Sequence, residues 1–274
     1  VTKLIDEIIN LAINQKFQIS ILIVNDASNH DRIDENKNLE NVHSVKILNM
    51  KINQGHARCI ATGLKYIFEK EDFDYVIPMD GDGEDRPEEI KEFINRIQNS
   101  NNNPIVGERV KRSENAIFKI CYQLHKLITL TFTGKPIKFG NFTCLPKSTV
   151  KKLINDKASW NSFSGSLTKV EQNLISIPSI RGVRYFGPSK MSFYNLIKHS
   201  LSIISVFRKT FLIRSALFII LYILFIKSYA SIITAIPLMF LLVAVYSISN
   251  LALRENMEEF DKSLSNIKNI DEIK

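Results

Sequence analysis

Residues 75–87 read Tyr-Val-Ile-Pro-Met-Asp-Gly-Asp-Gly-Glu-Asp-Arg-Pro, an apolar run followed at once by acids, glycines and a proline. The apolar run predicts a strand over Tyr75–Met79, and the proline favours the first turn of a helix over Pro87–Ile97. Four carboxylates therefore lie within six residues at the end of a strand. Their mutual repulsion favours a bound divalent cation, although an acidic turn that caps the following helix explains any single one of them. These four residues are Asp80, Asp82, Glu84 and Asp85.

The spacing of the acids distinguishes between kinds of cation site. An EF-hand loop that starts at Asp80 needs glycine at its sixth position and glutamate at its twelfth, where this sequence has Asp85 and Lys91. A phosphatase Asp-x-Asp-x-Thr motif needs threonine where Glu84 stands. Asp80 and Asp82, two residues apart, suit one Mg²⁺ or Mn²⁺ that keeps positions open for substrate phosphate oxygens.

The sequence on both sides of the acids alternates between strand and helix patterns. Helical apolar spacing covers Leu4–Ile13 and Ala57–Phe68, and β-branched runs cover Phe17–Val24 and Val45–Leu48. Strands separated by helices predict an α/β domain with a parallel sheet. Because ligands of such sheets bind beyond the carboxyl ends of the strands, Asn25–Ser28 is a second candidate for the site.

The composition is that of a folded protein with a basic balance. The 274 residues are 45% hydrophobic and 23% charged, which excludes a disordered or collagen-like chain. A net charge of +8 indicates an anionic partner such as nucleic acid, a phosphorylated substrate or anionic lipid. The three scattered cysteines form no CxxC pair, so the sequence favours neither a disulfide framework nor a zinc site.

Two apolar segments predict a membrane hairpin over residues 210–253. Ser228–Leu253 has no charged residue over 26 positions, and the segment before it contains Arg214, which we expect to reach the headgroups. A buried helical hairpin of a soluble protein is the alternative. Basic residues lie at the ends away from the short connection, so the positive-inside rule predicts a cytoplasmic catalytic domain. Residues 254–274 are mixed in charge and are expected to form a solvated cytoplasmic tail helix.

Residues 191–209 repeat apolar side chains at helical spacing between polar ones. This pattern predicts an amphipathic helix in the membrane interface, with core packing as the alternative. Residues 181–214, which include this helix, hold seven bases and no acid, whereas residues 68–92 hold eleven acids and three bases. The basic run suits an anionic lipid surface, and the acidic run suits a cation.

Three motifs, in this order, resemble family 2 glycosyltransferases. They read Val-Asn-Asp-Ala-Ser-Asn-His-Asp (24–31), Asn-Gln-Gly-His-Ala-Arg-Cys-Ile-Ala-Thr-Gly-Leu (53–64) and Met-Asp-Gly-Asp-Gly-Glu-Asp-Arg-Pro-Glu-Glu-Ile (79–90). With the hairpin, the set is similar to the membrane branch that includes dolichyl-phosphate mannose synthase and bacterial polyprenyl-phosphate glycosyltransferases. The resemblance implies a Rossmann-like, nucleotide-sugar-binding GT-A domain over residues 1–190.

The resemblance also implies roles for individual residues. The nucleotide sugar would be bound by Asp26, Ser28, Gly55 and Asp80. Asp80 and Asp82 would hold the metal ion on the diphosphate. The catalytic set would be Asp82, Glu84, Asp85 and Arg112, and the acceptor phosphate would be held by Arg112, Arg181, Arg184 and Lys190. His56 and Arg58 are interpreted as surface residues at a helix start rather than as catalysts.

The sequence departs from the family in two places. The family normally opens with a strand that ends in Pro-x-Tyr/Phe-Asn-Glu, and this sequence begins at the helix after it, so we expect a truncated domain that lacks its first strand. The familiar Gly-Asp-Phe-Arg is replaced by Gly140-Asn141-Phe142-Thr143, which removes an acid and a base from the acceptor region.

Two classes of function follow. The first is an inverting, metal-dependent glycosyltransferase that moves a sugar from a nucleotide-sugar donor to polyprenyl phosphate, or to another membrane acceptor such as a growing glycan. The second is a membrane-anchored binding or assembly protein with a degenerate glycosyltransferase fold. We expect the lipid bilayer and no nucleic acid as partner, and the sequence leaves a homo-oligomer open.

Overall fold

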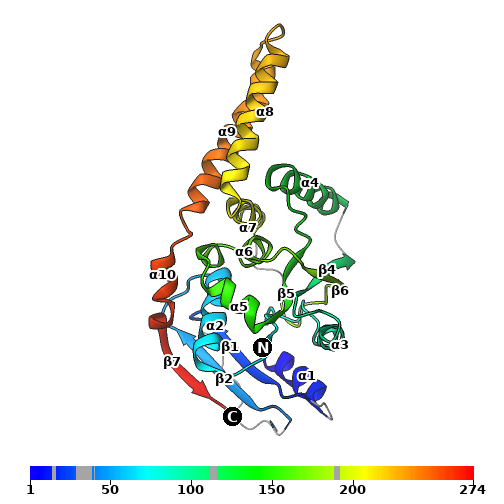
Figure 1. The fold of residues 1–274 in the computed structure, drawn as a ribbon, viewed down its shortest axis with the longest axis vertical. Helices are drawn as coiled ribbons and strands as arrows, with labels where there is room; N and C mark the ends of the chain where they lie inside the picture. The colour runs from blue at the N-terminus through cyan, green and yellow to red at the C-terminus, as the bar shows by residue number, and fades with distance from the viewer. Residues whose placement is uncertain (14–16, 29–38, 40, 112–115, 188–191) are drawn as a thin grey trace.

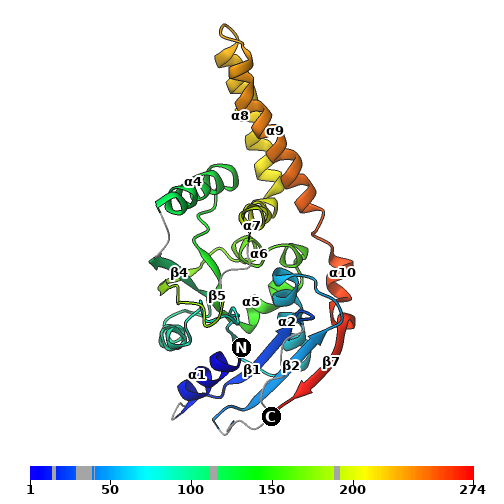
Figure 2. The same ribbon diagram turned by 180° about the vertical axis from the view of Figure 1, so that it is seen from behind.

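The computed structural model describes residues 1–13, 17–28, 39, 41–111, 116–187 and 192–274. Two long helices project from an α/β body, with both chain ends at the body (Figures 1 and 2). The α/β class and the apolar hairpin predicted from the sequence are both confirmed.

The body contains two mixed sheets rather than the predicted parallel one. The first has the order β1-β2-β7, with β1 parallel to β2 and β7 antiparallel to β2. The second has the order β3-β5-β4-β6, in which only β4 and β6 are parallel. The strands are β1 (Ser20–Asn25), β2 (Ser44–Met50), β3 (Tyr75–Val76), β4 (Ile105–Lys111), β5 (Phe139–Pro146), β6 (Ile175–Ile180) and β7 (Ile267–Glu272).

Helix α1 (Thr2–Ala12) joins the two sheets. Its residues Leu4 and Ile8 pack in a cluster with side chains of the second sheet, and Ile5 and Ile9 pack in a cluster with Val45 of the first. Within the described residues β1 pairs only with β2 and β3 only with β5, and α1 packs against both sheets.

The body contains further helices, of which two were predicted from their apolar patterns. The helix expected over Ala57–Phe68 is α2, and the one expected over Pro87–Ile97 begins as a single 3₁₀ turn. The elements are α2 (His56–Lys70), η1 (Pro87–Glu89), α3 (Ile90–Ile97), α5 (Lys147–Ile154), η2 (Lys157–Trp160) and α6 (Phe163–Val170).

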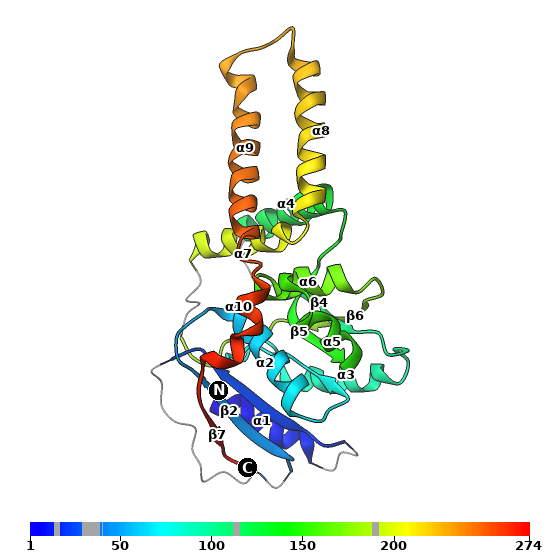
Figure 3. The same cartoon turned by 60° about the vertical axis from the view of Figure 1, so that its left-hand side comes forward.

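The predicted hairpin consists of α8 (Arg208–Ile226) and α9 (Ile232–Ala252). Both are long and apolar enough to cross a membrane. Two further helices, α4 (Ala116–Thr133) and α7 (Phe193–Ser205), lie across the base of the hairpin (Figure 3). Arg214 of α8 donates to the carbonyl oxygen of Thr131 at 2.6 Å, so this cation contacts the C-terminal turn of α4.

The prediction of a solvated helix over residues 254–274 is wrong. The chain returns to the body as α10 (Met257–Asp261), η3 (Ser263–Asn266) and β7. The Phe260 ring stacks on Trp160 with centroids 5.4 Å apart, and the Trp160 Nε1–H donates to Glu259. The strand was missed because β7 is exposed along almost all of its length, so its sequence carries no alternation of apolar and polar residues.

Candidate active site

The loop after β3, residues 80–85, is called the acidic loop below. Asp80 accepts hydrogen bonds on Oδ1 from His56 Nε2 at 2.9 Å and from Asn141 Nδ2 at 3.3 Å. His56 is the first residue of α2 and Asn141 lies in β5, so two separate elements meet at one carboxylate oxygen. This contact requires the second sheet and α2 to be in place together.

Two arginines from residues 181–187, called the strap below, pair with the acidic loop. Arg184 lies 3.0 Å from both Asp82 Oδ2 and Glu84 Oε1, and Arg181 makes a short ion pair with Glu84. The backbone N–H of Tyr185 donates to the Asp82 carbonyl oxygen at 3.0 Å. The strap is therefore fixed to the acidic loop by both main-chain and charged contacts.

Gly83 allows the strap to lie this close. It has φ of +88°, and a Cβ built at this position would meet the Tyr185 ring at 2.5 Å. The Tyr185 hydroxyl donates to Glu7 of α1 at 2.5 Å, and the Lys3 ammonium lies 4.6 Å from the ring centroid. Only glycine combines this backbone conformation with this contact.

The last acid of the loop, Asp85, is buried beneath the others. Its Oδ2 accepts the backbone N–H of Asp80 at 3.0 Å, and Arg109 of β4 lies 3.9 Å from Oδ1. Burial and the charge of Asp80 raise the pKa of Asp85 to about 6.

The Asp80 and His56 pair shifts in the opposite sense. Burial acts to raise the pKa of Asp80, but the hydrogen bond and charge of His56 outweigh it, and the pKa is lowered. Burial likewise acts to lower the pKa of His56, and Asp80 reverses this, so its pKa is raised. The pair therefore favours a carboxylate beside an imidazolium.

Asp26, at the end of β1, holds the start of α2. Its two carboxylate oxygens accept the backbone N–H groups of Gln54 at 2.8 Å and Gly55 at 2.9 Å. Gly55 has φ of +90° and precedes the first residue of α2. Ser28 donates its backbone N–H to Asn25 Oδ1. The contacts of Asp26 with the backbone of Gln54 and Gly55 therefore fix the position of His56, the residue that contacts Asp80.

Within the described ranges, no group of three or more His, Cys, Asp or Glu side chains is arranged to hold a metal ion. The hydrogen bonds described for the Asp80 carboxylate fall on one oxygen, which leaves the other for a ligand. Two carboxylates suit Mg²⁺, because this ion is commonly bound by one or two protein carboxylates together with substrate phosphates and water. Asp80 and Asp82 fit that donor set, provided that Arg184 leaves Asp82.

Comparison with known protein families matches residues 2–150 to Glycosyl transferase family 2. This stretch is more than half of the sequence and contains the acidic loop, Asp26, His56 and Asn141. The chain belongs to glycosyl transferase family 2.

Two curated relatives share this family 2 sequence over 189 residues at 25% identity, which is 66% of this chain. Both are named undecaprenyl-phosphate 4-deoxy-4-formamido-L-arabinose transferase, from Klebsiella pneumoniae strain 342 and from K. pneumoniae subsp. pneumoniae strain ATCC 700721 / MGH 78578. The match spans 55% of each relative, so this chain covers about half of their length.

The candidate site contains residues that the sequence patterns placed elsewhere or did not single out. His56 was interpreted as a surface residue, yet it contacts Asp80. Arg109 and Asn141 also reach the acidic loop. The usable signal was the position of His56 directly after Gly55, at a helix start facing the strand ends. Arg58, by contrast, pairs with Glu259 of α10.

The predicted acceptor residues are only partly described. Arg181 and Arg184 lie at the acidic loop, against Glu84 and Asp82, rather than apart from it. Arg112 and Lys190 lie outside the described residues. The structure therefore joins the predicted metal-binding and phosphate-binding groups into one cluster of opposite charges.

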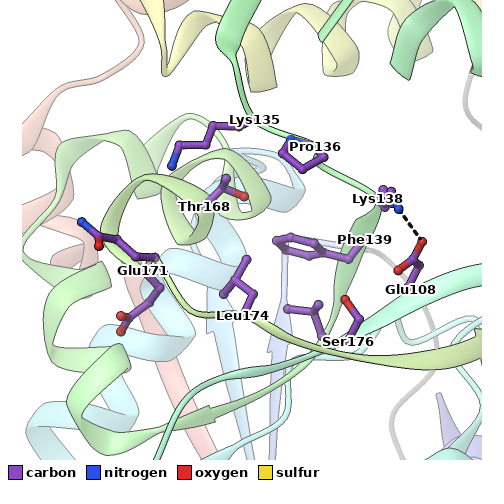
Figure 4. A pocket seen from close by; sticks show the side chains of 11 residues that line it. Glu108, Lys135, Pro136, Lys138, Phe139, Thr168, Glu171, Leu174 and Ser176 are labelled. Atoms are coloured by element: carbon purple, nitrogen blue, oxygen red, sulfur yellow. Dashed lines mark ion pairs between the residues drawn. The ribbon is translucent and has the colours of Figure 1, made fainter. Parts of the chain in front are cut away.

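A separate cavity of about 300 Å³ lies on the other side of β4 (Figure 4). Its lining includes Phe139 and the ion pair of Glu108 with Lys138, 3.3 Å apart. Successive side chains of a strand point to opposite faces, so Glu108 faces this cavity while Arg109 faces the acidic loop. The cavity is therefore not part of the candidate active site.

Proposed function

We propose that this chain is an inverting glycosyltransferase that moves a sugar from a nucleotide-sugar donor to polyprenyl phosphate at the cytoplasmic face of a membrane. The observation that carries the proposal is the contact of Arg184 with Asp82, which brings a phosphate-binding type of side chain beside a metal-binding type. The apolar hairpin on the same chain provides the membrane location.

The donor half of the site consists of the acidic loop and the start of α2. Asp80 and Asp82 would hold Mg²⁺ or Mn²⁺, and the ion would neutralise the negative charge of the leaving nucleoside diphosphate. Asp26, Ser28 and Gly55 bind the nucleoside part. Because Asp26 already holds two N–H groups at the start of α2, its contribution includes fixing the backbone that faces the nucleotide.

The acceptor half uses the strap. A lipid phosphate is already an anionic nucleophile, so attack at the anomeric carbon needs no base to remove a proton from a hydroxyl group. Asn141 lies where the family commonly has an acid, and an amide suits an acceptor of this kind. Arg184 and Arg181 would hold the acceptor phosphate, with Arg112 and Lys190 as further predicted contacts. Glu84 and Asp85 complete the acceptor side.

The relatives support a polyprenyl-phosphate acceptor by their names, which specify undecaprenyl phosphate. A direct test uses the full chain in lipid nanodiscs with a panel of nucleotide sugars, and with undecaprenyl phosphate or undecaprenol as acceptor. We expect transfer to the phosphate and none to the neutral alcohol. Transfer to the alcohol would contradict the acceptor assignment, and donor binding without transfer to either lipid would favour a non-catalytic binding protein.

The orientation is tested by cysteine labelling in sealed vesicles or intact cells. The connection between α8 and α9 contains Ser228, whereas α10 and β7 return to the body, so both helix ends at the body lie on one side of the bilayer. With the native cysteines replaced, we expect Ser228→Cys to react from outside and Asp72→Cys, in the body, to react only from the cytoplasm. The reverse pattern would contradict a cytoplasmic site.

A further inference from the structure

Asp80 differs from the other acids of the acidic loop, because one of its oxygens is held and the other has no partner. Its Oδ1 accepts the hydrogen bonds from His56 and Asn141. Asp82 uses both oxygens, since Oδ1 accepts a backbone N–H of its own loop at 3.0 Å and Oδ2 pairs with Arg184. Within the described part of the chain, Asp80 Oδ2 is alone among the carboxylate oxygens of this loop in having neither a hydrogen bond nor an ion pair. Asp80 therefore offers an oxygen without first losing a partner.

The closer of the two donors to Asp80 is the His56 ring. Its Nε2 lies 2.9 Å from Oδ1 and 3.0 Å from Asn141 Nδ2, so the three side chains are in mutual contact. The terminal torsion of an aspartate is broad, and a carboxylate without such donors turns readily about it. A hydrogen bond to Oδ1 therefore fixes the direction in which Oδ2 points. The bond needs only a proton on Nε2, which the neutral ring also carries, so it does not depend on the charge of the ring.

The backbone that carries His56 is held on both sides of this residue. Before it, Asp26 accepts two consecutive backbone N–H groups, at 2.8 and 2.9 Å. After it, Arg58 lies 3.0 Å from Glu259 of α10. His56 is the first residue of α2, so its ring extends from a fixed helix end toward the acidic loop. The end of β1 and the segment that returns from the hairpin therefore both contribute to the position of the ring.

Outer residues of this kind have a known effect on metal sites. Carboxylates that bind a metal are themselves hydrogen-bonded, and loss of such an outer partner typically weakens metal binding or activity 10- to 100-fold. Two other roles for His56 make different predictions. A ring that bound the ion itself would place nitrogen in the coordination sphere, and a ring that acted as a competing cation would weaken binding of the ion.

We infer that His56 is a positioning residue for the proposed metal ion, which holds Asp80 Oδ1 so that Oδ2 is presented to the ion, with Asn141 as the second donor. The inference rests on the proposed function, because the ion belongs to it. It adds that the strength of metal binding depends on α2 as well as on the acidic loop.

The test measures Mn²⁺ affinity of the full chain in lipid nanodiscs by electron paramagnetic resonance. His56→Leu removes the donor, and His56→Gln restores an N–H donor on a side chain of similar reach. His43→Leu, the same change at an exposed histidine directly before β2, is the matched control.

We expect His56→Leu to weaken Mn²⁺ binding about 10- to 100-fold, as loss of an outer hydrogen-bond partner does. His56→Gln should recover most of the affinity, and His43→Leu should match the unsubstituted chain. The variants should unfold at the same temperature, because the His56 side chain is half exposed. Electron spin-echo envelope modulation should show no directly coordinated nitrogen.

Several results would overturn the inference and leave sugar transfer to polyprenyl phosphate standing. Unchanged affinity in His56→Leu is one, and tighter binding is another, since His56 would then be a competing cation. Nitrogen modulation that disappears in His56→Leu would make His56 a ligand instead. Weaker binding that comes with a lower unfolding temperature and that His56→Gln does not restore would assign His56 to the fold. If the unsubstituted chain binds no Mn²⁺, the inference falls together with the metal assignment of the proposed function.

Discussion

The acidic loop and helix α4 differ in whether their side chains have partners within the chain. In the loop, Asp80 contacts His56 and Asn141, and Asp82 contacts Arg184. In α4, by contrast, Leu127 is 61% exposed and Leu130 is 46% exposed. The charged groups of the loop are therefore paired with other residues of the chain, whereas these two leucines of α4 are exposed at the surface.

The difference indicates what a ligand must do at each region. At the loop a ligand has to replace existing ion pairs, so binding depends on a close match of charge and geometry. At α4 and the hairpin, lipid only has to displace water, which contributes about 25 cal/mol for each Å² of apolar surface and makes little demand on geometry. We therefore expect the acidic loop to determine which ligand binds, and the apolar helices to determine where the protein is located.

The strongest effect is expected at Trp160, where the body holds the chain that returns from the hairpin. This ring is fully buried and stacks on Phe260 of the returning chain. Trp160→Ala should lower the free energy of unfolding by about 3–5 kcal/mol, as large-to-small changes at buried aromatic residues do. Denaturant unfolding of the body in detergent measures it, with Trp160→Phe as a milder control that keeps a ring.

If Trp160→Ala and the unsubstituted chain unfold at the same denaturant concentration, the returning segment does not stabilise the body. Packing of α10 on the body would then not be what holds the C-terminal end of the hairpin to the body.

The next effect is expected in the loop itself. Asp82→Asn removes the charge but keeps the shape, and we expect the transfer rate to fall about 10²- to 10³-fold, as when one charge-stabilising group of an active site is removed. Binding of Mn²⁺, followed by its electron paramagnetic resonance signal, should weaken in parallel. Asp72→Asn, fully exposed in its side chain, is the matched control.

The metal assignment is tested separately by removing the ion. Activity of the unsubstituted chain should disappear in excess chelator and return with Mg²⁺ or Mn²⁺. Full activity in chelator would mean that Asp82 acts without a metal, and the loop would then be a cluster of ion pairs alone.

Most of the fold was predictable because local patterns were consistent with it. The acidic loop, the strand before it and the helical segment that begins at Pro87 follow from a short stretch of sequence, although the strand covers only Tyr75–Val76 of the expected Tyr75–Met79. The parallel sheet was wrong because alternating strands and helices give the order of elements but not their pairing, and β5 returns antiparallel between β3 and β4. Strand direction depends on connections far apart in the sequence.

The site was predictable as a set of residue types but not as a set of contacts. The sequence placed Arg184 with a phosphate and Asp82 with a metal, and the structure brings them 3.0 Å apart. More than 100 residues separate them, so no spacing rule connects them. The burial of Thr129 and Thr133 was hidden for a related reason, since the sequence does not show which side of this helix meets the hairpin.

A smaller effect is expected from Arg184→Ala. The side chain is three-quarters buried between Asp82 and Glu84, and its guanidinium can bond two phosphate oxygens. We expect the KM for polyprenyl phosphate to rise about tenfold, which corresponds to one hydrogen bond to a charged group, while the affinity for the nucleotide sugar stays nearly unchanged. Arg184→Lys should recover part of the loss because it restores the charge.

Steady-state kinetics with each substrate varied in turn separates these cases. A variant that loses donor affinity and keeps acceptor affinity would show that the strap serves the nucleotide diphosphate. Arg184 would then belong with the metal-binding carboxylates that it contacts, and the division into donor and acceptor halves would have to be redrawn.

The smallest effect concerns a polar group that is buried without any charged partner. Cys144 of β5 is almost fully buried, and burial raises the pKa of its thiol to about 12. Because the raised pKa favours the neutral thiol, the thiolate stays scarce up to about pH 10, where an ordinary cysteine is mostly ionised. In a Cys121→Ser background, iodoacetamide should therefore leave Cys144 unmodified between pH 7 and 9 and should modify it after unfolding. Mass spectrometry of the labelled peptide measures this, and Asp72→Cys gives the rate of an exposed thiol.

Modification of native Cys144 at the rate of the exposed thiol would mean that β5 opens readily. Asn141, three residues earlier on the same strand, would then be a poor support for Asp80, and the contrast between a preassembled loop and an open membrane face would fail at the loop.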